Sequence, residues 1–180
     1  MSYHLSKPIV IADYDPQWPL LYEQERQQLT THLAPILQQI EHIGSTSVPG
    51  LGAKPIIDIS VSVLALSDVD DFVPALARLG YEDANINPIF QRRLFCKGPY
   101  NEGTHHLHFT VHGSTTWKEP ILLRDYLRVH PDEAAHYQEV KRMSAAKHQS
   151  DLNGYHEEKS GCVQALLEKA HAWGEFNLGR

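Results

Sequence analysis

Near the N-terminus, apolar positions recur at the three- and four-residue spacing of an amphipathic helix. Asp15 and Pro16 supply a helix start, because an aspartate caps free amides and a proline fits the first helical position. The apolar face consists of Trp18, Leu21, Tyr22, Leu29, Leu33, Ile36, Leu37 and Ile40. Pro35 is expected to end or bend this helix. Residues 7–12, which precede it, are expected to form a short edge strand.

A strict alternation of apolar and polar residues from 55 to 63 is typical of a β-strand. It places Asp58, Ser60 and Ser62 on one face and isoleucines and valines on the other. A helix that begins with a capping box is predicted from 67 to about 80. Further strands are predicted at 41–44, 81–83, 91–96 and 104–111.

After Thr116 the apolar spacing becomes helical as far as the end of the chain. Thr116 and Glu119 form a second capping box, and Pro131 begins a further helix. A third helix is predicted from 151 or 153 to 173. Strands followed by helices are typical of an α+β domain. We therefore predict one domain over residues 1–180, a mixed β-sheet with an N-terminal helix and a C-terminal helical layer.

Composition narrows the classes of function. The formal net charge of the 180 residues is −6, which argues against broad nucleic-acid binding, because such binding needs a basic surface. Cys96 and Cys162 stand alone, as suits a reducing compartment, and they lack zinc-site spacing. No leader-like N-terminus or membrane-length apolar run is visible. We expect a cytoplasmic protein that does not enter a membrane, and the sequence gives no indication of its oligomeric state.

The turn that follows strand 41–44 carries candidate phosphate ligands. Gly44 lets the backbone approach a ligand closely, and Ser45, Thr46 and Ser47 offer hydroxyl and amide groups that suit a phosphate. Two later side chains complete this hypothesis: Lys54 adds positive charge, and Asp58 is placed to hold a divalent metal. The alternative is a tight connection of turn-forming residues, with Asp58 on a solvated strand face.

Histidines alternate along the strand predicted at 104–111. His106, His108 and Thr110 share one face, because residues two apart in a strand point the same way. Two imidazoles near Asp58 could bind a transition metal or move protons. The alternative is a polar face of hydrogen-bonded, solvated histidines. His105 is expected to be structural, and His42 could serve either role. The remaining histidines are expected on the surface: His4, His32, His112, His130, His136, His148, His156 and His171.

Basic residues of the helical half extend the candidate anion site. Arg124 and Arg128 are four apart and share one helix face, and Lys159 lies on another face with Tyr155. These cations could neutralise a triphosphate. In the alternative, the arginines pair with acids of their own region, namely Glu119, Asp125 or Asp132.

Ile43-Gly44-Ser45 followed by Asp58 resembles the signature of the nucleotidyltransferase superfamily, in which an Asp-x-Asp/Glu strand follows a Gly-Ser turn. Ser60 departs from that pattern, because it stands where the second carboxylate belongs. Two carboxylates normally share the metals, so the residues do not support a standard two-metal site. His106 or His108 could replace a third carboxylate, which would favour a softer ion than magnesium, or no ion.

The longer string at 41–59, EHIGSTSVPGLGAKPIIDI, resembles the GrpB family. The resemblance covers nearly the whole chain and implies a nucleotidyltransferase-like fold. Some members of that family are fused to dephospho-coenzyme A kinase, which links them to nucleotide or coenzyme metabolism by association. The further matching motifs are Tyr14-Asp15-Pro16-x-Trp18, His106-Leu-His108, the hexapeptide at 123–128, Tyr137, Lys141, Tyr155 and Lys159.

Two functions follow from these features. In the first, an enzyme transfers a nucleoside monophosphate from a nucleoside triphosphate to a small acceptor, with magnesium or a transition metal as cofactor. In the second, a module binds a nucleotide or other phosphorylated small molecule without chemistry, because Ser60 replaces the second carboxylate. A scaffold without a ligand fits least. His108-Phe-Thr110 also matches one half of a two-histidine phosphoesterase, but His4 and His112 are poor candidates for the other half.

Overall fold

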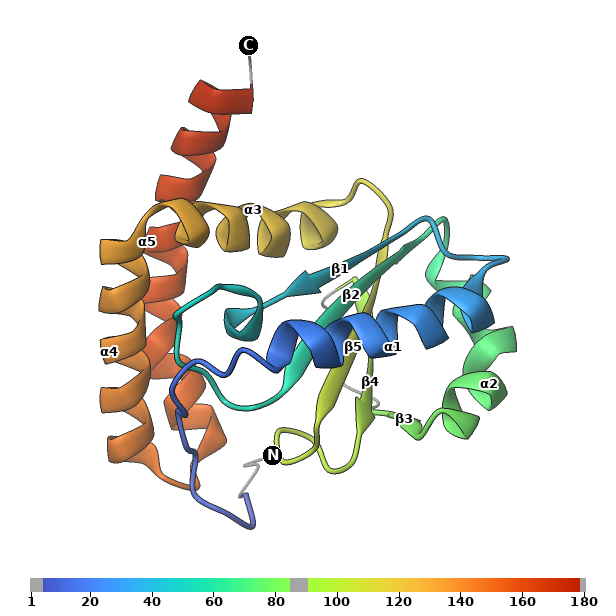
Figure 1. Ribbon diagram of the computed structural model, residues 1–180, viewed down its shortest axis with the longest axis horizontal. Helices are drawn as coiled ribbons and strands as arrows, with labels where there is room; N and C mark the ends of the chain where they lie inside the picture. The colour runs from blue at the N-terminus through green and yellow to red at the C-terminus, as the bar shows by residue number, and fades with distance from the viewer. Residues whose placement is uncertain (1–4, 85–90, 179–180) are drawn as a thin grey trace.

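A five-stranded mixed sheet forms the centre of the chain (Figure 1). The structure, a computed structural model, describes residues 5–84 and 91–178, with side chains as far as Glu175. Strands β2 and β5 run parallel, and the other neighbouring strands run antiparallel. The strand order is β1 (Gln39–Ile43), β2 (Ile57–Val63), β5 (His105–Val111), β4 (Arg92–Lys97) and β3 (Tyr81–Asp83).

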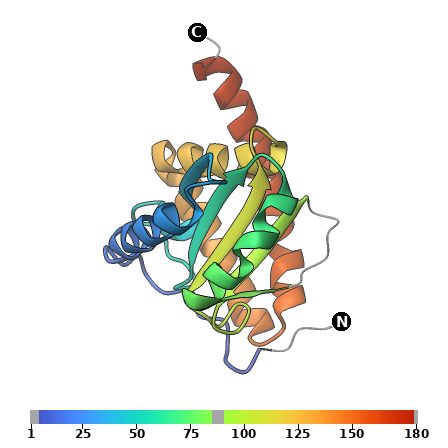
Figure 2. The same ribbon diagram turned by 90° about the vertical axis from the view of Figure 1, so that its right-hand side faces the viewer.

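One face of the sheet is apolar and is covered by helices α1 (Trp18–Leu33) and α2 (Val73–Arg78). In Figure 2, α2 lies across this face and α1 lies beside it. The alternation of β2 and β5 produces this face, because every second residue of each strand points into the same core. Its buried side chains include Trp18, Leu29, Leu33, Ile57, Ile59, Val61, Val63, Leu76, Leu107 and Phe109.

The opposite face of β2 and β5 is polar and lies toward the C-terminal helices α3 (Thr115–Val129), α4 (Pro131–His148) and α5 (Leu152–Leu178). Helix α3 contacts β1 and β5, while α4 and α5 pack against each other (Figure 1). Val48 and Leu51 of the Gly-Ser turn are buried among side chains of all three helices. The helical layer therefore holds the turn beside the polar face of the sheet.

The predicted α+β fold, a mixed sheet with an N-terminal helix and a C-terminal helical layer, is confirmed. Several local predictions need correction, and α1 ends at Leu33, before Ile36, Leu37 and Ile40 of its predicted apolar face. Residues 7–12 form no strand: Ala12 alone pairs with Ala53, and the amide of Ile9 instead bonds the carbonyl of Gln149 at 2.7 Å. The segment predicted as one helix from 67 to 80 begins as a 3-10 stretch at Leu66–Phe72 and becomes helical only in α2.

A further correction concerns the start of α3. Ser114, not Thr116, caps this helix, because its hydroxyl accepts from the amide of Trp117 at 3.3 Å. Helix α5 also continues beyond Trp173, to Leu178. His4, weighed above as part of a second histidine motif, lies outside the described residues.

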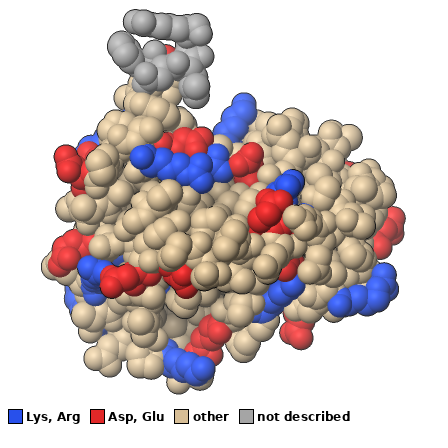
Figure 3. All heavy atoms as spheres, in the orientation of Figure 1, with Lys and Arg blue, Asp and Glu red and all other residues tan. Residues whose placement is uncertain are grey.

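Charged side chains of both signs are interspersed over the face that Figure 3 shows. Within the described residues, no helix combines the length and the apolarity that crossing a membrane requires.

Candidate functional site

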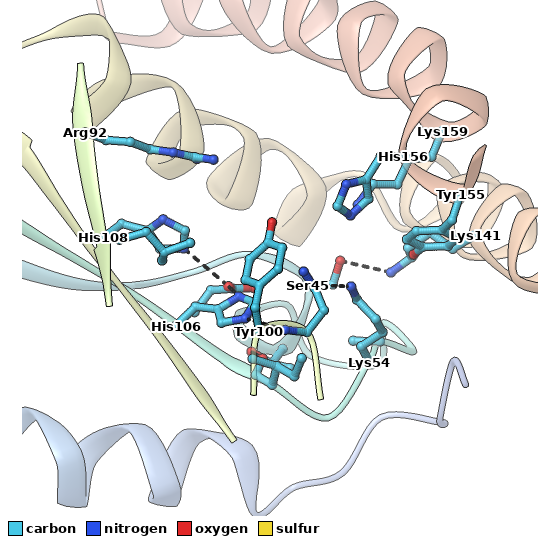
Figure 4. A pocket seen from close by; sticks show the side chains of 16 residues that line it. Ser45, Lys54, Arg92, Tyr100, His106, His108, Lys141, Tyr155, His156 and Lys159 are labelled. Carbon is cyan, nitrogen blue, oxygen red and sulfur yellow. Dashed lines mark hydrogen bonds and ion pairs between the residues drawn. The ribbon is translucent and has the colours of Figure 1, made fainter. Parts of the chain in front are cut away.

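A cavity of about 180 Å³ opens over the polar face where β2 and β5 begin. Figure 4 shows side chains from these strands, from the Gly-Ser turn and from helices α4 and α5 converging on it. The chemistry divides into two halves. Asp58, His106 and His108 form the sheet half, and Lys141 and Lys159 form the helical half, together with Lys54 from the loop before β2.

Strand register brings Asp58 and the two histidines together. In the parallel pairing of β2 with β5, Asp58 lies opposite His106 and Ser60 lies opposite His108. Asp58 Oδ1 is 3.2 Å from His106 Nδ1 and 3.4 Å from His108 Nε2. One ligand atom from each residue lies within 4.8 Å of the others. Two imidazole nitrogens and one carboxylate oxygen are a donor set that suits a transition metal, so these side chains fit such an ion.

The same contacts set the ionisation of the group. Burial alone would raise the pKa of Asp58, but hydrogen bonds from His106 and His108 outweigh burial and hold that pKa far below its ordinary value. Burial lowers the pKa of His108, although the adjacent Asp58 opposes this shift. Asp58 is therefore a carboxylate and His108 is neutral near pH 7, which are the forms that ligate metals.

Gly44 is required for this arrangement. Its φ of 70° and ψ of −174° lie in a region that is essentially restricted to glycine. A Cβ at this position would lie 2.5 Å from Asp58 Oδ2. The glycine therefore turns the chain and also leaves room for the carboxylate.

The helical half of the cavity is strongly cationic. Lys141 of α4 is buried, and its Nζ donates to Ser45 Oγ at 2.9 Å and to the carbonyl of Gly52 at 2.5 Å. Lys54 donates to Asn101 Oδ1. The Nζ atoms of Lys54 and Lys159 lie 5.3 and 5.0 Å from the ring centre of Tyr155. Among the described residues, none of the three lysines has a carboxylate within salt-bridge distance.

Burial and mutual repulsion destabilise the charged form of these lysines. Burial, and then repulsion from Lys159, lower the pKa of Lys54 to about 8 and that of Lys141 to about 7. Burial lowers the pKa of Lys159 too, although Asp58 favours its charge. An anion in the cavity would supply the missing negative charge and restore the ammonium forms.

The structure brings Ser45, Lys54, Lys159, Asp58, His106 and His108 to this cavity, whereas Gly44 lies beside Asp58 without lining the cavity. Thr46 also borders it, but its hydroxyl is 3.0 Å from His42 Nε2 and donates to the carbonyl of Ile56. Ser47 is directed elsewhere, because its hydroxyl donates to the carbonyl of Gly44 at 2.5 Å. Both hydroxyls therefore shape the turn.

The two arginines predicted to bind phosphate are held by protein groups. Arg124 is 9% exposed, and its guanidinium bonds Glu41, Asp125 and the carbonyl of His42. Arg128 donates to the carbonyl of Ser47 at 2.8 Å, and it does not line the cavity. Both arginines also pair with Asp125, Arg124 at 2.8 Å and Arg128 at 3.5 Å. This is the alternative that the sequence offered.

Several cavity residues were not among the predicted site residues: Arg92, Tyr100, Asn101, Lys141, Tyr155 and His156. His156 was expected on the surface, but it lies three residues before Lys159 on the same face of α5. Burial, and then Lys159, lower its pKa to about 3, so it is neutral. The three-residue spacing between His156 and Lys159 is the sequence feature that could have placed His156 at the cavity. The signal for Lys141 was its place among the family-matching residues, and its contact with Ser45 depends on the packing of α4.

Comparison with known proteins places the chain in a family. A family model described as GrpB protein matches residues 8–169. The chain belongs to the GrpB family. The crystal structure of conserved protein GrpB from Enterococcus faecalis superposes with a TM-score of 0.79 and 34% identity, covering 89% of this chain and 98% of that one. The family resemblance inferred from the Gly-Ser turn is thereby confirmed.

Longer relatives carry the same region. UPF0157 protein YqkA from Bacillus subtilis is 35% identical over 95% of this chain, and this chain spans half of its length. A dephospho-CoA kinase from Mycolicibacterium paratuberculosis is 24% identical over 93% of this chain, which covers 47% of that protein.

We predict that Gly44→Ala destabilises the fold more than Gly50→Ala does. Both glycines have positive φ, but a Cβ at Gly50 meets nothing within 4 Å. The control, Gly50→Ala, should lose about 1–2 kcal/mol of unfolding free energy through backbone strain alone. Gly44→Ala should lose about 3 kcal/mol or more, because it also collides with Asp58. Urea unfolding measures both values, and equal losses would contradict the proposed contact.

We predict a structural role for Arg124. Arg124→Met should lower the free energy of unfolding by about 1–3 kcal/mol, because it leaves the carbonyl of His42 and nearby carboxylates without their partner. Arg78→Met is the matched control, since Arg78 is exposed on α2. Thermal and urea unfolding provide the comparison. Unchanged stability in Arg124→Met would refute this role.

Proposed function

We propose that this chain binds a phosphorylated small molecule in the cavity and transfers a nucleotidyl group from a nucleoside triphosphate to a small acceptor. The observation that carries the proposal is the charge imbalance of the cavity. Among the described residues, Lys54, Lys141 and Lys159 face a single carboxylate, that of Asp58, and Lys141 is buried while the other two lysines are half-buried. Phosphates are the common biological anions whose charge matches such a cluster.

The residues divide the work of this reaction between them. Lysines 54, 141 and 159 and the hydroxyl of Ser45 would bind the phosphate chain. Asp58, His106 and His108 would hold a divalent metal, which supplies Lewis-acid stabilisation of the phosphoryl oxygens. An acceptor oxygen bonds to the α-phosphorus as the bond to the pyrophosphate leaving group breaks, and any proton on that oxygen is released to water. Catalysis is then positioning and charge stabilisation.

One observation favours a second candidate, a binding module without chemistry. Ser60 is 1% exposed and follows Asp58 by two residues, so it lies on the same face of β2. Its hydroxyl is buried, with no hydrogen-bond partner among the described residues. A second metal would lack its usual carboxylate there. Ligand binding with no release of pyrophosphate from any nucleoside triphosphate, across many acceptors, would support the module.

We predict that Asp58→Asn weakens zinc and manganese binding by more than about 100-fold, because it removes the carboxylate of the donor set. It should also abolish metal-dependent release of pyrophosphate from nucleoside triphosphates. Calorimetry measures the first effect and a pyrophosphate assay the second. Glu82→Gln, at an exposed acid on β3, is the matched control. Full metal affinity in Asp58→Asn would exclude the proposed metal site.

We predict that binding of inorganic sulfate, which does not titrate near neutrality, takes up protons at pH 8. Sulfate favours the ammonium forms of Lys141 and Lys54, whose pKa values in the free protein are about 7 and about 8. Affinity should therefore fall as pH rises through this range. Calorimetry in buffers of different ionisation enthalpy measures the uptake.

Lys141→Met should lose much of this proton uptake. Lys147→Met is the matched control, because Lys147 lies on the same helix but is exposed. Sulfate binding without proton uptake by the unsubstituted chain would show that these lysines do not bind the anion.

A further inference from the structure

A second, larger hollow of about 790 Å³ adjoins the cavity. The two share side chains, so a ligand can extend from one into the other without leaving the protein. The shared residues are Ser45, Asp58, Arg92, His108, His156 and Lys159. The hollow therefore begins beside the carboxylate and one imidazole of the candidate metal site.

Two helix faces line the hollow. Helix α3 contributes Pro120, Leu123 and Leu127, and α5 contributes Val163 and Leu167. These positions recur every three or four residues, so each helix turns one continuous face to the hollow. Leu123, Val163 and Leu167 are only partly buried. The fold thus keeps an aliphatic surface open next to a cationic one.

The residues of α5 that border the hollow become less polar toward Leu167, with Gln164 as the polar exception. His156 and Lys159 border both spaces, Ser160 follows, and Val163 and Leu167 border the hollow alone. The guanidinium of Arg124 also borders the hollow, but it is held by Glu41 and Asp125. A ligand that matches this gradient carries its anionic end toward the lysines and an apolar body toward Leu167.

We propose that the hollow binds the aliphatic body of a phosphate or diphosphate ester whose anionic end lies beside Lys159, where the hollow meets the lysine cavity that would hold the triphosphate of the donor. The inference rests on the proposed function, in which this ester is the acceptor: its phosphate oxygen bonds to the α-phosphorus of the nucleoside triphosphate, and pyrophosphate leaves. An aliphatic body matches most of the hollow, because, with Ile43 and Val48, seven of the lining residues are aliphatic or proline, while Tyr137, His156 and Gln164 could stack on or hydrogen-bond a base. Purine and pyrimidine rings need stacking or hydrogen-bonding partners.

The test compares inorganic pyrophosphate with butyl and octyl diphosphate, using the full chain and calorimetry. Each methylene buried in the hollow should strengthen binding by up to about fourfold. Octyl diphosphate should therefore bind at least about tenfold more tightly than pyrophosphate. Leu167→Asp should remove this gain and leave pyrophosphate affinity unchanged. Ala165→Asp, on the exposed face of the same helix, should retain the gain.

Each contrary result has a separate meaning. If pyrophosphate binds, and Lys141→Met weakens it, but the alkyl chain adds nothing, the inference is wrong and the proposed function stands. If pyrophosphate does not bind at all, the anion site itself is wrong. The inference is also overturned if adenosine diphosphate binds more tightly than octyl diphosphate and loses this advantage in Leu167→Asp. That result would assign the hollow to a nucleoside.

Two controls protect the test from indirect effects. Circular dichroism checks the fold of Leu167→Asp, and Leu167→Gln replaces it if the aspartate unfolds the chain. Sedimentation velocity checks the oligomeric state. A change of oligomeric state in Leu167→Asp, with no change in alkyl-chain dependence, would identify the hollow as a subunit contact and overturn the inference.

Discussion

Unbalanced positive charge inside a shielded cavity is the constraint on which the rest of the site depends. Lys141 is almost wholly buried and donates to Ser45 and Gly52, yet among the described residues no carboxylate neutralises it. Burying ammonium groups in this way opposes folding, because desolvation favours the neutral amine. Lys141 and Lys159 of the helical layer and Lys54 of the loop before β2 nevertheless gather around the Gly-Ser turn. An anion, as we propose, would supply the negative charge that this cluster lacks.

The sheet half of the cavity supplies the complementary chemistry. Parallel pairing of β2 with β5 places Asp58 between two imidazoles, and Gly44 leaves the space that the carboxylate occupies. The low pKa of Asp58 follows from these contacts. The carboxylate and imidazoles therefore face the lysines across a single opening, an arrangement that suits the metal–phosphate ligand we propose. The aliphatic hollow between α3 and α5 continues from that opening.

Sequence patterns predicted the sheet half of the site because strand alternation fixes which side chains share a face. Asp58, His106 and His108 could be placed together once the two strands were taken as neighbours. The helical half depended on contacts between distant segments. Lys141 lies 96 positions from Ser45, and no spacing in the sequence records their meeting. Arg124 shows the same limit, since its alternative pairing with Asp125 could be proposed from the sequence, whereas its contact with Glu41 spans 83 positions and is visible only in the structure.

The most direct test is diffraction from crystals grown with manganese and inorganic pyrophosphate, with data collected at a wavelength where manganese scatters anomalously. The account predicts an anomalous peak within ligand distance of Asp58, His106 and His108. It also predicts pyrophosphate density that reaches from this ion to Lys54, Lys141 and Lys159. An anomalous peak on another surface, or pyrophosphate bound away from the three lysines, would contradict it.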